Sequence, residues 1–153
     1  MKILGIRTAP AQLRYAIIEI DNGTATLING ADEHLIKVPA GMNANADILA
    51  WQKDEVDRIL RQNPDINKVI LKTGEYGRSD TKSSRLGAHL DAIAILAAKQ
   101  ANIPVEEKTY SQIGTQRAKV KEHAENRVGR TSTHWNEQIA DAIVAAWSCR
   151  GDS

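Results

Sequence analysis

The chain has 153 residues, which suits one domain with enough interior for its own hydrophobic core. Hydrophobic residues make up 42% and charged residues 25%, an ordinary globular balance that excludes a disordered chain. The formal net charge of +1 argues neither for nor against an anionic partner, because only a local basic patch would matter.

The single cysteine, Cys149, excludes an internal disulfide and a cysteine metal cluster, which favours a reducing compartment. No apolar run approaches the length of about 20 residues that a membrane-spanning helix needs. Residues 1–6 open directly into strand-like sequence without a signal-peptide pattern. We therefore expect a cytoplasmic protein without a membrane partner, built as one domain over residues 1–150 with a short polar tail at 151–153.

The first third of the chain predicts strands joined by tight connections. Apolar, β-branched runs predict strands over residues 3–6, 13–20 and 24–28, with a shorter extended piece over 35–38. Residues 8–12, which include Pro10, form the first turn. Asp21-Asn22-Gly23 is a strong hairpin signal and predicts that the second and third strands are antiparallel.

The remainder alternates helices with strands. Asn45 is expected to cap a helix over 46–62, which Asn63-Pro64 ends. Residues 69–71 are wholly apolar, as in a strand buried on both faces of a parallel sheet. We expect the following elements next: a helix over 81–101 with a core stripe of Leu86, Leu90, Ile93 and Ala97, a strand over 104–110, a charged helix over 111–125, and an Ala-rich helix over 136–149. This order predicts an α/β fold, a mixed sheet of about five strands with helices on both faces.

Three stretches carry a likeness to a known family. They are residues 3–7 with 15–18 (ILGIR and YAII), residues 86–98 with 103–105, and residues 137–143 (EQIADAI). In order, they resemble the opening strands, the long helix with its following strand, and the final helix of the ribonuclease H-like superfamily, in particular the RuvC-type Holliday-junction resolvases. The resemblance implies a ribonuclease H-like domain.

Nucleases of this kind gather carboxylates around two divalent ions about 4 Å apart. The resemblance implies one acid at the end of the first strand, one at the end of the fourth, and one or two on the last helix. Carried across, these positions are Arg7, Lys72 and Asp141, with Gln138 one turn before Asp141. Two ligands would thus be cations, and Arg7, Lys72 and Asp141 are expected to form an ion-pair cluster or to attract a phosphate.

A shifted alignment leaves an alternative acidic set. Glu75 lies three residues past Lys72, and Glu137 and Asp141 share a helix face at i and i+4. These three carboxylates would make a divergent nuclease that uses Mg²⁺ or Mn²⁺. Basic residues at Arg78, Lys82 and Arg85 would instead track a phosphate backbone, with Tyr76 stacking on a base, although the same charges also suit a solvated helix face.

Three hypotheses for function follow. The first is a non-catalytic module that needs no cofactor and binds nucleic acid or a protein partner through a cationic former active-site cleft. The second is the divergent metal-dependent endonuclease. The third is a structural or assembly subunit with no nucleic-acid role. Separately, Trp135 and Trp147, at the two ends of the last helix, are expected to pack in the core or, as the alternative, to contact a second copy in a homodimer.

Overall fold

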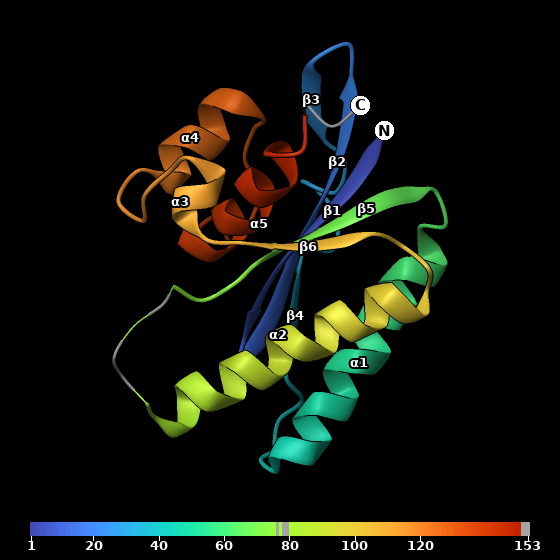
Figure 1. Cartoon of the computed structure of the whole chain (residues 1–153), viewed down its shortest axis with the longest axis vertical. Coiled ribbons are helices and arrows are strands. Elements are labelled where there is room, and N and C mark those ends of the chain that lie inside the picture. Colours follow the sequence, from blue (N-terminus) through green and yellow to red (C-terminus); the bar gives the residue numbers. More distant parts are fainter. Residues whose placement is uncertain (76, 78–79, 151–153) are drawn as a thin grey trace.

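A computed structural model describes residues 1–75, 77 and 80–150. Its elements run in the following order: β1 (Lys2–Ala9), β2 (Gln12–Asp21), β3 (Thr24–Leu27), β4 (Leu35–Lys37), α1 (Asn45–Gln62), β5 (Ile66–Lys72), α2 (Lys82–Gln100), β6 (Val105–Lys108), α3 (Tyr110–Ile113), α4 (Val120–Arg127) and α5 (Glu137–Trp147). The predicted mixed α/β architecture is confirmed, with six strands instead of about five (Figure 1).

The sheet has the order β3-β2-β1-β5-β6. β3 pairs with the C-terminal part of β2 (residues 18–21), and β4 pairs with its N-terminal part (residues 12–14). β1, β2 and β3 form an antiparallel meander, in which Asn22 and Gly23 adopt positive φ angles of 50° and 80° at the hairpin turn. β1, β5 and β6 run parallel, so their carboxyl ends meet at one edge of the sheet. This edge positions the site described below.

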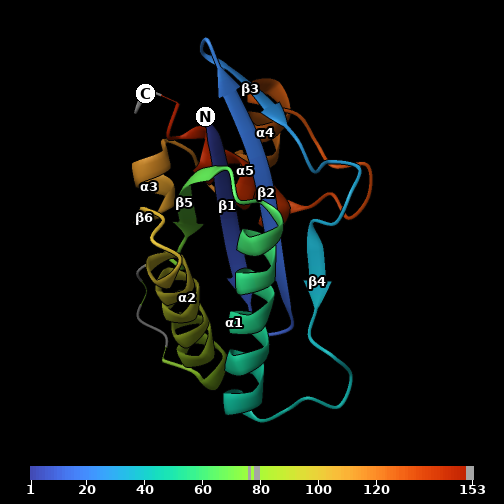
Figure 2. The ribbon, with the colours of Figure 1, turned by 90° about the vertical axis from the view of Figure 1, so that its right-hand side faces the viewer.

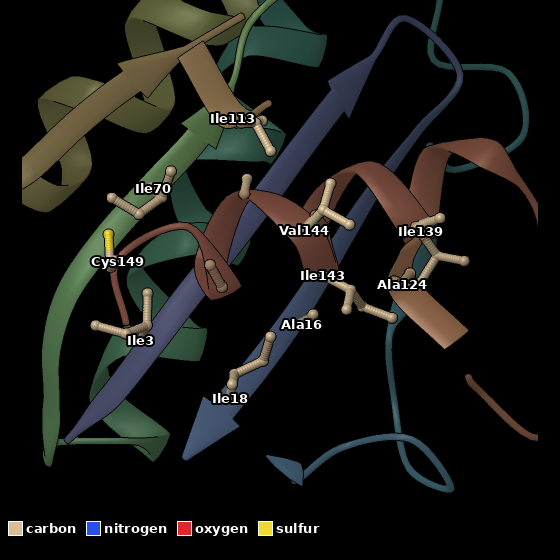
Figure 3. Close-up of a cluster of buried hydrophobic side chains, with 14 of the residues drawn as sticks. Ile3, Ala16, Ile18, Ile70, Ile113, Ala124, Ile139, Ile143, Val144 and Cys149 are labelled. Atoms are coloured by element: carbon tan, nitrogen blue, oxygen red, sulfur yellow. The ribbon is translucent and has the colours of Figure 1, made fainter. Parts of the chain in front are cut away.

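The two faces of the sheet carry separate cores, because side chains alternate between faces along each strand. Leu4 and Ile6 of β1 face α1 and α2, which lie side by side on one face (Figure 2). Ile3 of β1 faces the other way, into a cluster with Ile143 and Val144 of α5 (Figure 3). The same alternation places the side chain of Arg7 on the α5 face.

Gly5 allows α5 to lie directly on β1. A Cβ atom at Gly5 would lie 1.9 Å from the backbone oxygen of Ala142 and 3.1 Å from the Cβ of Ala146. Only glycine permits this approach. It brings Asp141, the residue next to Ala142, down to the end of β1.

Three local predictions were wrong. Asn45 is the first residue of α1 and not its cap, since Ala44 holds the N-cap position without a side-chain hydrogen bond. The charged helix over 111–125 is two helices, because Gly114 ends α3 in the left-handed region at φ 85°. In α2, Ala94 joins the buried stripe and Ile93 is only half-buried.

None of the helices in the described part of the chain is both long and apolar enough to cross a lipid bilayer. The expected polar tail, 151–153, lies outside the described residues.

Candidate functional site

The ends of β1 and β5 meet the start of α5 around one small cavity. Arg7 comes from β1, Lys72 is the last residue of β5, Asp141 lies on α5, and Tyr110 begins α3. These four residues line a cavity of about 270 Å³ together with Glu75, Arg117, Glu137 and Gln138. They come together because β1 pairs in parallel with β5 and because α5 packs closely against Gly5.

Asp141 is a buried carboxylate with two donors. Only 2% of the residue is exposed. Its Oδ2 accepts from Arg7 Nε at 3.1 Å, and its Oδ1 accepts from the Tyr110 hydroxyl at 2.7 Å. Burial raises the pKa of Asp141 above its ordinary value, although the Tyr110 hydroxyl and the charges of Arg7 and Lys72 oppose the rise. Both oxygens of this carboxylate are therefore already engaged by the protein.

Lys72 is a buried cation with a different carboxylate partner. It is 1% exposed, and its Nζ lies 3.0 Å from Glu75 Oε1. Its other contacts are uncharged, with the Thr73 carbonyl at 2.5 Å and the Tyr110 ring centroid at 4.0 Å. The expected pair of Arg7 with Asp141 is present, whereas Lys72 pairs with Glu75 and not directly with Asp141.

The alternative acidic set lines the same cavity, but each carboxylate has a cationic partner. Glu75 pairs with Lys72, Asp141 pairs with Arg7, and Glu137 pairs with Arg117 at 2.9 Å. Among the described residues, no group of three His, Cys, Asp or Glu side chains could hold a metal ion. A pair of divalent ions does not fit this donor set, because guanidinium and ammonium groups occupy the positions beside the carboxylate oxygens.

Arg14 is a site residue that sequence reasoning missed. It lies directly opposite Arg7 in the β1–β2 register, so the two side chains share the α5 face. Arg14 is 6% exposed, donates to the amide oxygen of Gln138, and leaves its Nε without a partner. Desolvation lowers its pKa. The sequence does hold a sign of this role: Arg14 lies two residues before Ala16 and four before Ile18, so its side chain is on the same buried face of β2.

Within the described residues, the fully buried members of the cleft with formal charges are Arg14, Lys72 and Asp141. No carboxylate in the described part of the chain forms an ion pair with Arg14. Lys72 pairs with Glu75 and Asp141 pairs with Arg7, so Arg14 is left as the buried cation without a carboxylate partner in the described part of the cleft. Burial of an unneutralised cation is unfavourable, so this imbalance favours an anion in the cleft.

A larger groove continues from the cavity toward the start of α2. It has a volume of about 590 Å³ and shares Arg7, Glu75 and Gln138 with the cavity. Its walls carry hydroxyl groups from Thr8, Thr73, Thr81, Ser83 and Ser84. Asp91 also lines the groove; burial raises the pKa of its carboxyl, and the Thr8 hydroxyl donates to it. Hydroxyl groups beside an arginine can donate to phosphate oxygens.

Two of the remaining predicted basic residues, Lys82 and Arg85, lie outside both hollows. Lys82 and Arg85 are exposed in the first turn of α2 and do not line the groove. Arg85 forms two 2.7 Å hydrogen bonds with Asp80, as a solvated helix face would. Tyr76 and Arg78 lie outside the described residues.

Trp147 stacks between Arg127 and Arg150, with guanidinium-to-ring distances of 4.3 and 3.5 Å.

Comparison with protein-family models gave no match, and comparison with curated proteins gave none either. Solved structures do match. Thermus thermophilus RuvC superposes with a TM-score of 0.77 at 15% identity, covering 97% of this chain and 92% of that one. The yeast mitochondrial Holliday junction resolvase Ydc2 gives 0.64 at 11% identity, covering 95% and 76%.

A third match is the fowlpox virus resolvase in complex with Holliday junction DNA, with a TM-score of 0.52 at 16% identity over 99% of this chain and 98% of that one. T. thermophilus RuvC also matches in its complex with a Holliday junction substrate, with a TM-score of 0.75 at 16% identity over 97% and 92%. At these identities the likeness shows the fold, which is the ribonuclease H-like fold of RuvC and other Holliday-junction resolvases.

Proposed function

We propose that this chain uses its RuvC-type fold to bind the phosphodiester backbone of nucleic acid without cutting it. The observation that carries the proposal is the pair of cations, Arg7 and Lys72, at the strand ends where a two-metal nuclease needs carboxylates. An anionic backbone in the cleft would also balance the buried excess of positive charge beneath it.

The same charges argue against metal-dependent cleavage. At an effective dielectric constant of about 20, two like charges 4 Å apart repel by roughly 4 kcal/mol before screening. A divalent ion at Asp141 would have to displace the Arg7 guanidinium at 3.1 Å and would still lie near Lys72. The ion pair of Asp141 with Arg7 therefore disfavours a first ion, and the pairing of Glu75 with Lys72 and of Glu137 with Arg117 disfavours a second.

Branched DNA is the first ligand to test. T. thermophilus RuvC and the fowlpox resolvase are both described with Holliday junctions, and both share this fold. The groove beside the cavity is lined by Arg7 and by the hydroxyl of Ser83, groups that suit contacts to sugar and phosphate that carry no sequence information.

One observation favours a second candidate, a divergent nuclease. Glu75, Glu137 and Asp141 line one cavity, as a minimal acidic set would require. This candidate predicts cleavage of a four-way junction in Mg²⁺ or Mn²⁺ that Asp141→Asn abolishes. The binding module predicts no cleavage under the same conditions.

We expect a labelled four-way DNA junction to bind the protein in EDTA, with affinity that falls steeply as salt rises. Fluorescence anisotropy at several salt concentrations measures this. Arg7→Gln and Arg117→Gln should each weaken binding and reduce the slope of log K against log salt by about 1, since each removes one backbone contact. Arg117 is 79% exposed, so its replacement leaves the fold intact.

The matched control is Arg61→Gln, which removes the same charge from the end of α1 on the opposite face of the sheet. It should leave both the affinity and the slope unchanged. Absence of salt-dependent binding by the wild-type protein, or an equal loss in all three variants, would contradict the proposal and favour a structural subunit or a protein partner.

A further inference from the structure

We propose that the cleft contains an anion subsite that the protein fills with its own Glu75 carboxylate, and that a phosphate group takes this place when ligand binds. The subsite consists of Lys72 Nζ and the backbone N–H of Tyr110. The inference builds on the proposed function in one respect, namely that the incoming anion is a backbone phosphate of nucleic acid.

Both donors converge on a single oxygen atom. Glu75 Oε1 accepts from the Tyr110 N–H at 2.7 Å and lies 3.0 Å from Lys72 Nζ. The pKa of Glu75 is lowered even though burial opposes the shift, because the Tyr110 N–H and the Lys72 ammonium outweigh it. The placement of these two donors around one oxygen atom therefore favours an anion over a neutral group.

The donors are fixed by the fold, whereas the acceptor is not. Lys72 ends β5 with 1% of its side chain exposed, and its ammonium lies over the Tyr110 ring. Glu75 has 45% of its side chain exposed, and among the described residues its carboxylate has no partners beyond these two donors. An exposed carboxylate held only by these donors can leave them at little cost to packing.

Lys72 needs an anion in this position. Among the described residues, its two other direct contacts are the Thr73 carbonyl and the Tyr110 ring, which are uncharged. Removal of the Glu75 charge would leave a buried ammonium without a neutralising partner, and such a group is strongly destabilising. A phosphate oxygen would restore the same hydrogen bonds with charge assistance, in a cavity that Arg7 and Arg117 also line.

Competition of this kind predicts a gain of binding when Glu75 is neutralised. In Glu75→Gln, inorganic phosphate should bind about tenfold more tightly than in the wild-type protein, because the internal competitor is weakened. The melting temperature of the variant should rise with phosphate at constant ionic strength, with chloride as the balancing anion. Its affinity for the four-way junction should rise in parallel.

Asp65→Asn is the matched control, since Asp65 also pairs with a lysine, Lys2, but at the opposite end of β5. It should gain no phosphate affinity. Glu75→Asp provides a second variant that keeps the charge and shortens the side chain, so it should show a smaller gain than Glu75→Gln even if the latter folds poorly.

The outcomes separate the two proposals. No gain in phosphate affinity in either Glu75 variant, or an equal gain in Asp65→Asn, overturns the self-filled subsite, whatever the wild-type protein does with DNA. A gain in phosphate affinity specific to the Glu75 variants supports the subsite. If that gain appears while no variant binds DNA, the proposed function fails and the subsite stands.

Discussion

Gly5→Ala is expected to lower the free energy of unfolding by about 3 kcal/mol, because the added methyl group overfills the β1–α5 contact. The new Cβ would lie 1.9 Å from the Ala142 oxygen, which is backbone and cannot rotate away. α5 would have to move off the sheet. For a chain of this size the melting temperature should fall by roughly 6–12 °C, and urea unfolding measures the change in free energy.

Gly87→Ala is the control for this substitution. A Cβ at Gly87 in α2 meets nothing within 4 Å, so alanine should stabilise the helix by about 0.5–1 kcal/mol through its higher helix propensity. A loss below about 1 kcal/mol in Gly5→Ala would show that α5 does not lie against β1 as described. The position of Asp141 beside Arg7 would then need another explanation.

Arg7→Asp is expected to destabilise the protein by about 3–5 kcal/mol at neutral pH, since it removes the partner of a buried carboxylate and adds a second negative charge. Arg7→Gln, which removes the positive charge without adding a negative one, should cost less, about 1–3 kcal/mol. Urea unfolding of both variants at pH 7 in EDTA gives the comparison. Equal losses would contradict a close contact between positions 7 and 141.

The destabilisation of Arg7→Asp should shrink as the pH falls. Burial already raises the pKa of Asp141, and a second carboxylate would raise it further. The folded state then binds more protons than the unfolded state at pH values between the unfolded pKa, about 4, and the raised folded pKa. Stability in this window increases as pH decreases, so the deficit should be smaller at pH 5 than at pH 7.

Much of the fold was accessible from the sequence because β1, β2 and β5 are largely apolar and the turns carry specific residues. Asn22-Gly23 marked the hairpin, and the apolar run within Ile66–Lys72 marked a strand buried on both faces. The split at Gly114 was missed, because a glycine inside a charged helical pattern gives no local sign of whether it ends the helix.

The site was only partly accessible. The resemblance brought Arg7, Lys72 and Asp141 together, and the structure has them lining one cavity. The exchange of partners, in which Lys72 pairs with Glu75, depends on side-chain placement that spacing along the chain does not determine. The role of Tyr110 as a donor to Asp141 joins residues 31 positions apart and has no local signature.

Diffraction from crystals soaked in Mn²⁺, recorded with anomalous signal, tests most directly whether Arg7 and Lys72 have replaced metal chemistry in the cleft. The proposal predicts no paired ions beside Asp141 and an intact contact between its carboxylate and the Arg7 guanidinium. Two manganese ions about 4 Å apart, coordinated by Asp141 with Glu75 or Glu137, would contradict it and restore the nuclease hypothesis.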